Sequence, residues 1–280
     1  MTEKPIEKAC IVTGATGCMG KEIAMALAKE HKAVILACRN VKRAENLKSE
    51  IIRTTKNKKI YVRELDLESN DSIKAFAGWI ERKGITIWAL MNNAGVMQRN
   101  YRVDETGTEI SFAVNFIGTL NLTHRLIPYI VKGGNVVFTT SMTRRLHRAK
   151  NIELNETSEH FSQLGSYGRS KAALTHYAIY MANCYKDINI NCADPGIVDT
   201  NMITMSRWYD SIANVVFRPF IRSPKKGVEP ALKALTLNST GNIVTRHSVK
   251  QIPYSKYDQS HGHLVENTRE HLVALGVPMM

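Results

Sequence analysis

Two side chains that could transfer a proton lie four positions apart in the second half of the chain. Tyr167 and Lys171 fall in a helical segment, so they would share one face of a helix. A phenol is a poor acid–base catalyst at neutral pH, but a neighbouring ammonium stabilises the phenolate and lowers the pKa of the tyrosine. Ser141 follows the apolar run Val136–Thr140, which is typical of a strand, and would lie at the carboxyl edge of a sheet, where ligands bind. Taken alone, the Tyr–Lys pair fits an ordinary amphipathic helix better than a catalytic site.

A glycine-rich turn links the first predicted strand to the first predicted helix. Its sequence is Thr13-Gly14-Ala15-Thr16-Gly17-Cys18-Met19-Gly20. Glycines allow a tight turn and a close approach of the backbone to a pyrophosphate, and the helix N-terminus offers free N–H groups to that anion. A tight turn without a ligand is the alternative, but the position after the first strand of a βαβ unit favours a dinucleotide.

The end of the second predicted strand, Cys38-Arg39-Asn40, carries no carboxylate. Sites that prefer NAD usually place a carboxylate there for the ribose 2′-hydroxyl, whereas an arginine accommodates the 2′-phosphate of NADP. Arg39, with Lys42 and Arg43 close behind, therefore predicts NADP(H) as the preferred cofactor, with NAD(H) as second choice. The alternative for Arg39 is a solvated charge at the end of a strand.

Short apolar runs alternate with longer helical segments through most of the chain. This order predicts right-handed βαβ crossovers and a parallel sheet covered on both faces. We therefore expect one Rossmann domain over residues 1–280, a doubly wound α/β fold with a parallel sheet of about seven strands flanked by helices. The expected strands are Ala9–Thr13, Ala33–Cys38, Ile60–Leu65, Ile87–Met91, Val136–Thr140 and Ile188–Ala193. The expected helices include Cys18–Glu30, Lys42–Lys56, Asp71–Arg82, Tyr167–Tyr185 and Pro224–Leu237, with a short helix near His263–Leu275.

One segment departs from this alternation. Met202–Ser223 has apolar residues mostly three or four apart, which suggests a helix with one apolar face. We expect it to be a lid over an apolar substrate, with a subunit contact as the alternative. Residues 243–280 form a polar C-terminal tail.

Composition narrows the class of protein. Hydrophobic residues make up 44% and charged residues 22% of the 280 residues, which excludes a disordered or fibrous chain. The net charge of +13 is spread over short clusters such as Lys56–Lys59, Arg144–Arg148 and Lys225–Lys226, which favours a basic, soluble surface over nucleic-acid or membrane-surface binding.

The cysteines and the N-terminus indicate a compartment. The five cysteines contain no CxxC pair, so we expect no metal site, no disulfide framework and a reducing environment. The polar segment Met1–Lys8 and the lack of a long apolar run predict no signal peptide and no membrane anchor, hence a cytoplasmic protein.

Together these motifs resemble the classical short-chain dehydrogenase/reductase family over nearly the whole chain. The residues that carry the resemblance are Thr13-Gly14-x3-Cys18-x-Gly20, Asp66-Leu67, Asn92-Asn93-Ala94-Gly95, Asn115, Ser141, Tyr167-x3-Lys171 and Pro195-Gly196. Finer features are similar to the retinol-dehydrogenase-like branch: Ala37-Cys38-Arg39-Asn40, the long gap between Ser141 and Tyr167, Arg222-Ser223-Pro224 before Gly227, and the Glu266–Leu275 tail. One departure is Cys18, which stands where the family's glycine motif has its second glycine. Another is the expected lack of the membrane anchor that this branch often carries.

The resemblance implies catalytic roles for four residues. Tyr167 would donate or accept the proton, and Lys171 would bind the nicotinamide ribose and tune the phenol. Ser141 would hydrogen-bond the substrate oxygen, and Asn115 would hold a water in a proton relay. The alternatives are a satisfied strand-end hydroxyl for Ser141 and a helix cap or kink for Asn115.

The motifs and the resemblance also imply a set of cofactor contacts. Asp66 and Leu67 would contact the adenine, although Asp66 could instead form an Asx turn. The full set is Gly14, Thr16, Gly17, Cys18, Met19, Gly20, Arg39, Asn40, Asp66, Leu67, Asn93, Ala94, Gly95, Tyr167, Lys171, Pro195, Gly196, Val198 and Thr200.

The expected function is that of an NADP(H)-dependent oxidoreductase that interconverts a carbonyl and an alcohol, with hydride carried by the nicotinamide. The substrate would be a small apolar molecule, and the resemblance implies a homo-oligomer. The alternative is a catalytically idle protein that senses NADP(H) on the same fold.

Overall fold

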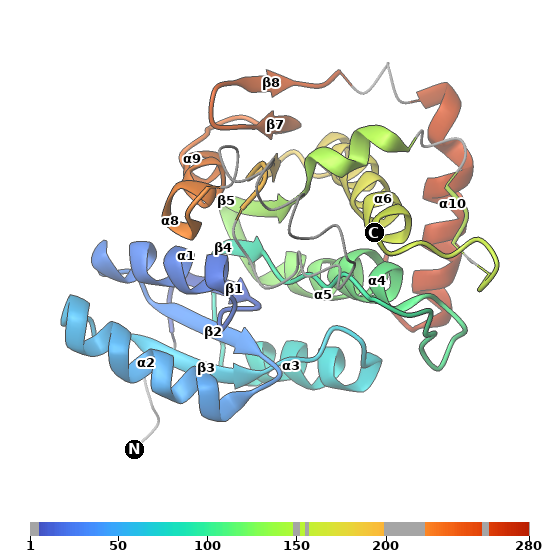
Figure 1. The fold of residues 1–280 in the computed structure, drawn as a ribbon. Coiled ribbons are helices and arrows are strands. Elements are labelled where there is room, and N and C mark those ends of the chain that lie inside the picture. The colour runs from blue at the N-terminus through green and yellow to red at the C-terminus, as the bar shows by residue number, and fades with distance from the viewer. Residues whose placement is uncertain (1–5, 148–151, 155–156, 199–221, 254–257, 280) are drawn as a thin grey trace, which may run out of the picture.

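Eight strands form one sheet, in the order β3-β2-β1-β4-β5-β6-β7-β8, in the computed structural model of the chain (Figure 1). The structure describes residues 6–147, 152–154, 157–198, 222–253 and 258–279. Neighbouring strands from β3 to β7 pair in parallel, and β8 pairs antiparallel to β7. The predicted doubly wound parallel sheet is confirmed, with seven parallel strands and one additional antiparallel edge strand.

The strands are β1 (Ala9–Thr13), β2 (Val34–Cys38), β3 (Ile60–Glu64), β4 (Ile87–Asn92), β5 (Ile130–Thr139), β6 (Asn189–Ala193), β7 (Asn242–Val244) and β8 (Val249–Gln251). The α-helices are α1 (Cys18–Lys29), α2 (Val41–Thr55), α3 (Asn70–Arg82), α4 (Ile110–Phe112), α5 (Thr119–Leu126), α6 (Gln163–Cys184), α8 (Pro224–Gly227), α9 (Glu229–Leu235) and α10 (Asp258–Ala274). A π-helical turn, Ala113–Gly118, joins α4 to α5, and 3-10 turns span Ile127–Tyr129 and Met142–Leu146.

The strands β1 and β2 are apolar except for Thr13, because both faces of the sheet are covered there. Every residue of β1 and β2 is buried. Successive side chains point to opposite faces, so Ile11 enters one hydrophobic cluster while Cys10 and Val12 enter the other. Continuous apolar runs are therefore the pattern that a parallel, doubly covered sheet requires.

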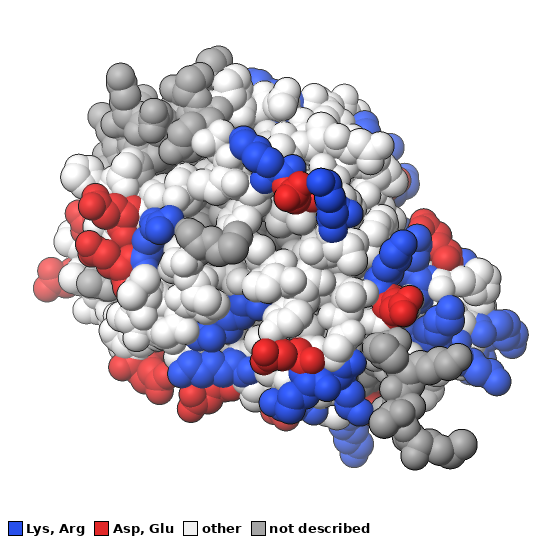
Figure 2. Space-filling model, turned by 180° about the vertical axis from the view of Figure 1, so that it is seen from behind, with Lys and Arg blue, Asp and Glu red and all other residues white. Residues whose placement is uncertain are grey.

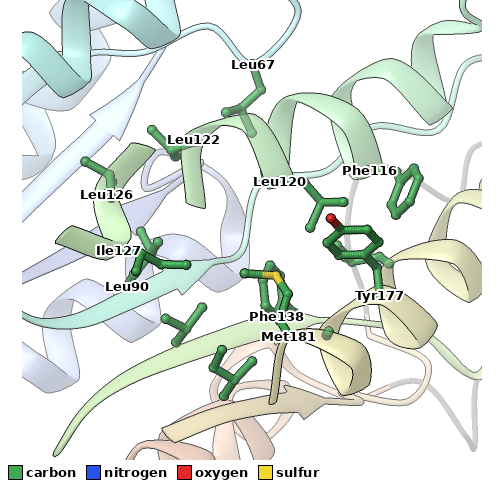
Figure 3. Packing of buried hydrophobic residues seen from close by; sticks show 14 of the residues in the cluster. Leu67, Leu90, Phe116, Leu120, Leu122, Leu126, Ile127, Phe138, Tyr177 and Met181 are labelled. Carbon is green, nitrogen blue, oxygen red and sulfur yellow. The ribbon is translucent and has the colours of Figure 1, made fainter. Parts of the chain in front are cut away.

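Different helices supply the two clusters. One face of the sheet packs against α3, α5, α6 and α10, and Figure 3 shows Leu120, Phe138, Tyr177 and Met181 from this larger cluster. The other face packs against α1, α2 and α9, as with Ile23 of α1. The site described below lies at the carboxyl edge of the sheet between these two layers.

Local signals fix where several helices begin. The side chain of Asn40 accepts a hydrogen bond from the Arg43 N–H (2.9 Å) and caps α2. Ser69 caps α3 and Ser162 caps α6 in the same way. These caps set the first residues of α2, α3 and α6.

The C-terminal part differs most from the expected elements. Strand β5 begins at Ile130 rather than Val136, and β7 and β8 lie in a region where no strand was predicted. The short helix expected near the C-terminus is the longer α10. Thr200 and residues 202–221 of the predicted lid lie outside the described residues, and the one-domain organisation stays a prediction.

The surface carries charges of both signs. On the face seen in Figure 2, Lys and Arg side chains are scattered and Asp and Glu side chains lie among them. Among the described helices, none combines the length and hydropathy that crossing a bilayer would need. In the same part of the chain, no group of three or more His, Cys, Asp or Glu could hold a metal ion.

Gly118 lies where the turn before α5 crosses the loop after β3. A Cβ at this position would be 2.0 Å from the Leu67 carbonyl oxygen. We predict that Gly118→Ala destabilises the protein by about 1–3 kcal/mol through overpacking, which lowers the Tm by roughly 2–12 °C. Thermal unfolding measures the effect. Gly262→Ala in α10 is the control, because a Cβ there meets no heavy atom within 4 Å. Equal Tm values for the two variants would contradict the prediction.

Candidate active site

A cavity of about 530 Å³ opens at the carboxyl ends of β1, β2 and β4. Thirteen of the predicted cofactor contacts line it: Gly14, Thr16, Gly17, Cys18, Met19, Gly20, Arg39, Asn40, Asp66, Leu67, Asn93, Ala94 and Gly95. They come from four separate segments, which follow β1, β2, β3 and β4, and the first segment includes the start of α1. The fold therefore brings together residues that are up to 81 positions apart in the sequence (95 minus 14).

The N-terminus of α1 faces this cavity without a side-chain cap. Gly17 is the N-cap residue, makes no side-chain hydrogen bond to the helix, and is followed by a first turn without an acidic residue. The free N–H groups and the positive end of the helix dipole are thus available to an anion. Cys18, the first residue of the helix, is exposed and lines the cavity. The departure from the family's glycine therefore adds a thiol to the lining of the cavity at this point.

Close backbone packing explains two of the glycines. Gly14 has a φ of +61°, and a Cβ there would be 2.9 Å from the Ala94 Cα. A Cβ at Gly20 would be 2.3 Å from the Gly14 carbonyl oxygen. The turn after β1, the start of α1 and the loop after β4 approach so closely that Gly14 and Gly20 have no space for a Cβ atom.

Thr13 ties the ends of β1 and β4 together. Its buried hydroxyl accepts hydrogen bonds from the N–H groups of Asn93 and Ala94, both at 3.0 Å, and donates to the Met91 carbonyl at 3.3 Å. The Asn93 side chain donates in return to the Thr13 carbonyl at 3.0 Å. Asn93 thus faces the cavity and also holds its floor.

The rim of the cavity beyond β2 is basic. The exposed Arg39 lines it, and Arg43, one turn into α2, lines it as well. Asn40 is also part of the lining, although its side-chain oxygen caps α2. Asp66 accepts a hydrogen bond from the Glu68 N–H (3.1 Å), so the Asx turn considered as an alternative is present at a residue that lines the cavity.

Gly95 connects the cavity to the predicted catalytic residues. A Cβ at Gly95 would lie 3.3 Å from both the Asn115 Oδ1 and the Lys171 Nζ. Asn115 is buried in the π-helical turn, accepts from the Val96 N–H (2.7 Å), and donates to the Val96 carbonyl (2.8 Å) and the Ser170 hydroxyl (3.0 Å). Both amide hydrogens of Asn115 are therefore used within the protein. A water held at this residue would have to donate a hydrogen bond to one of its oxygen atoms.

Tyr167 and Lys171 lie on the same face of α6, as their spacing predicts. The Lys171 Nζ is 5.9 Å from the centroid of the Tyr167 ring and donates to the Thr139 carbonyl at 2.9 Å. Burial lowers the pKa of Lys171 to about 8. Burial also raises the pKa of Tyr167 to about 12, against a lowering effect of the hydrogen bond with Ser141. The expectation of a lowered tyrosine pKa is not met in this structure, because desolvation outweighs the stabilising contacts.

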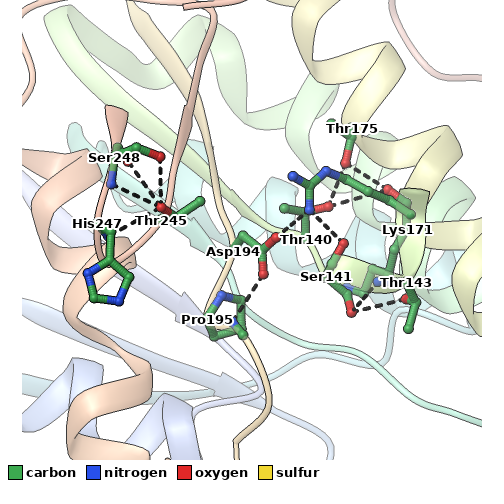
Figure 4. A network of polar contacts seen from close by, with 12 residues as sticks. Thr140, Ser141, Thr143, Lys171, Thr175, Asp194, Pro195, Thr245, His247 and Ser248 are labelled. Carbon is green, nitrogen blue, oxygen red and sulfur yellow. Dashed lines mark hydrogen bonds and ion pairs between the residues drawn. The ribbon is translucent and has the colours of Figure 1, made fainter. Parts of the chain in front are cut away.

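Ser141 follows β5 and caps the 3-10 turn Met142–Leu146. Its hydroxyl accepts hydrogen bonds from the Thr143 N–H (3.3 Å) and from the Thr143 hydroxyl (3.0 Å). The hydroxyl also bonds to Tyr167. Figure 4 shows Ser141, Thr143 and Lys171 in this polar network at the carboxyl edge. Ser141, Tyr167 and Lys171 are thus brought together from two elements.

Pro195, Gly196 and Val198, also predicted contacts, follow β6 and do not line the cavity. Gly196, at a φ of +73°, donates its N–H to Asp194 (3.0 Å), and the Arg222 side chain lies over it. Arg222 also donates to the Pro195 carbonyl at 3.2 Å. The Val198 side chain is buried and packs on Gly227, so only its backbone could meet a ligand.

Several residues that line the cavity were not among the predicted contacts. They are Thr13, Cys38, Arg43, Leu65, Val96 and Val114. Arg43 had a sequence signal, because it lies one helical turn from Asn40 and points to the same rim. The apolar residues had none, because their type is the same as that of ordinary core residues.

A family model described as short chain dehydrogenase matches residues 8–209. Retinol dehydrogenase 12 of Mus musculus is 31% identical over 229 residues, which cover 80% of this chain and 72% of that protein.

Solved structures share the fold. An uncharacterised protein from Mycobacterium paratuberculosis superposes with a TM-score of 0.74 at 23% identity, covering 97% of this chain and 95% of that one. A short chain dehydrogenase from Shigella flexneri, solved in complex with NADP, superposes with a TM-score of 0.65 at 21% identity, covering 89% of this chain and all of that one.

Proposed function

Because this chain belongs to the short-chain dehydrogenase family, whose members are oxidoreductases acting on CH–OH or C=O groups, we propose that it interconverts a carbonyl and an alcohol with NADP(H). The observation that carries the proposal is the position of Gly95. This residue lines the cavity and, on its other side, lies against Asn115 and Lys171. A cofactor in the cavity would therefore end beside the proposed acid–base residues.

The residues around the cavity fit NADP(H). The uncapped N-terminus of α1 and the turn Gly14–Gly20 would hold the pyrophosphate, and Asp66 and Leu67 would border the adenine. Arg39 and Arg43 offer two guanidinium groups to a 2′-phosphate. The Shigella flexneri relative was solved with NADP, which supports the same cofactor here. When bound, the nicotinamide supplies or accepts the hydride.

The chain's own residues would manage the proton and the substrate oxygen. Tyr167, protonated at neutral pH with its pKa of about 12, would donate its phenol proton to the oxygen during carbonyl reduction. In the reverse direction the deprotonated phenolate would accept the proton of the alcohol. Ser141, already bonded to Tyr167, would hold that oxygen. Lys171 would bind the ribose and place a positive charge near the phenol, and Asn115 would hold the segment after β4 in place.

The substrate class and the setting are also proposals. The mouse relative is named for retinol, a largely apolar alcohol, and this supports an apolar alcohol or aldehyde as substrate. We propose a cytoplasmic location because the five cysteines are free, which fits a reducing compartment. The proposal of a homo-oligomer rests on the family resemblance.

Tyr167→Phe tests the acid role. We predict that this variant loses at least about 100-fold in kcat for a carbonyl that the wild type reduces, because the transferable proton is removed. Its affinity for NADPH, measured by fluorescence titration, should be nearly unchanged. Tyr180→Phe is the control, because Tyr180 lies on the same helix but its hydroxyl bonds to Arg269 (2.9 Å). Substantial activity in Tyr167→Phe would remove Tyr167 from the acid role.

The pKa of Lys171 predicts a pH profile. Lysine is charged below its pKa, so the charge is complete at acidic pH and is lost as the pH rises through about 8. We predict that kcat/KM for NADPH, which reports groups of the free enzyme, is flat below this value and falls about tenfold per pH unit above it. Lys171→Arg should remove the fall while lowering the plateau, because arginine stays charged. A wild-type profile without a fall in this range would contradict the assignment.

Arg39 should decide the choice of cofactor. A charge-assisted hydrogen bond is worth about 1.5–3 kcal/mol, or roughly 10- to 100-fold in affinity. Arg39→Ala should weaken NADPH binding by that factor and leave NADH binding almost unchanged, as measured by titration of both cofactors. Lys42→Ala is the matched control, because it removes a nearby charge that does not line the cavity. Equal losses for both cofactors would mean that Arg39 does not bind the 2′-phosphate.

A further inference from the structure

Arg144, which is largely buried, and Asp194, which is buried, form an ion pair beside the proposed active site. The Arg144 side chain is 10% exposed and the Asp194 side chain is 3% exposed. The two residues come from different segments, since Arg144 lies in the 3-10 turn after β5 and Asp194 follows β6. Neither residue belongs to the sequence motifs that suggested the function, and Arg144 was expected to be part of a surface cluster.

Each partner also holds backbone that the proposed chemistry uses. The Arg144 Nη1 donates to the carbonyl of Ser141 at 2.7 Å and to the Asp194 Oδ2. The other oxygen of Asp194 accepts the Gly196 N–H at 3.0 Å. One chain of contacts therefore runs from Ser141 through Arg144 and Asp194 to Gly196, and Figure 4 shows Ser141, Asp194 and Pro195 along it.

The pair bridges the place where two paired strands separate. Strands β5 and β6 stay in register up to Thr139 and Ala193, and the Thr140 N–H still bonds to the Ala193 carbonyl at 2.9 Å. Beyond this point the two segments diverge into the Ser141 loop and the Pro195-Gly196 turn, although the Asp194 N–H still bonds to the Val244 carbonyl of β7 at 2.8 Å. The ion pair is the next connection between them.

Stability alone does not explain such a pair. Removing two charges from water costs about as much as their attraction returns, so apolar residues of similar size are often as stabilising. We propose that Arg144 and Asp194 are positioning residues that fix the distance between the Ser141 hydroxyl, which meets the substrate oxygen, and the Pro195-Gly196 turn, which the family resemblance implies to contact the cofactor. This inference rests on the proposed function for the role of Ser141 and on that resemblance for the role of the turn.

The electrostatics agree with this location. The charge of Asp194 reaches Tyr167 and raises its pKa, and Lys171 is the cation on the same helix as that phenol. The positive charge of Arg144 compensates the negative charge of the Asp194 carboxylate within the site. The pair thus acts on the backbone at Ser141 and on the charge near Tyr167.

Single and double variants separate positioning from stability. Arg144→Met leaves an unpaired carboxylate and Asp194→Asn leaves an unpaired guanidinium, so each alone should lower the Tm. Arg144→Met with Asp194→Asn removes both charges and leaves an amide oxygen to accept the Gly196 N–H. We expect the double variant to recover most of the Tm but to keep a roughly 10- to 100-fold loss in kcat/KM for an aldehyde that the wild type reduces, because small misplacements are costly in catalysis. Arg145→Met is the control, because Arg145 is an exposed neighbour in the same turn and its loss should change neither quantity.

Readouts without turnover keep this inference distinct from the proposed function. Hydrogen exchange over residues 141–147 and 194–198 should be faster in the double variant, and NADPH titration should show weaker binding. If the wild type reduces no carbonyl in a panel of aldehydes and ketones, the proposed function fails, and the exchange and titration data still decide whether the pair positions the two segments. If activity, exchange and NADPH affinity all return with the Tm in the double variant, the pair is only structural and the proposal is overturned.

Discussion

The sheet reverses its winding between β1 and β4, and the cavity exists because of that reversal. The chain runs from β1 outward to β2 and β3, then crosses back to β4 and continues outward to β5, β6 and β7. The connecting helices therefore leave to opposite faces, and the carboxyl ends of β1 and β4 open into a crevice between them. The backbone around this crevice is so close that Gly14 and Gly20 have no room for a side chain. The glycine motif is thus a requirement of packing as much as of ligand binding.

Local patterns predict most of this architecture. The bounds of β1 are those expected from its apolar run, and β2, β3, β4 and β6 begin and end within one residue of expectation. Buried parallel strands are apolar on both faces, and this gives a strong signal in the sequence. Strands β7 and β8 gave no such signal, because each has three residues and β8 is exposed along its length. The pairing of β7 depends on β6, which lies about fifty residues earlier in the chain, and β8 pairs in turn with β7.

The types and spacing of the side chains predicted which residues form the site, but they did not predict the pKa values of those residues. The spacing of Tyr167 and Lys171 placed both on one face of α6, but it could not show that burial shifts both pKa values against the charged forms. Burial depends on residues from β5, β6 and the loop after β4, which no local window contains. The burial of Arg144 was likewise not predictable from its neighbours in the sequence. In the sequence it belongs to a run of basic residues, whereas in the fold it is buried against Asp194, fifty positions away.

The polar side chains around the site divide into those that hold backbone and those that face open space. Thr13 and Asn115 spend their hydrogen-bonding groups on backbone of the β4 loop or on neighbouring side chains, and Asp194 holds Gly196. Arg39 and Cys18 are exposed at the cavity, where a ligand can reach them. Backbone that is fixed in this way offers its N–H and C=O groups at constant positions, which lowers the entropy that binding would otherwise cost. A substitution in the first group breaks hydrogen bonds that hold the backbone, whereas a substitution in the second group alters contacts with a ligand and leaves the backbone bonds intact. Cys18, at the position of the family's second glycine, belongs to the second group, because its exposed side chain lines the cavity.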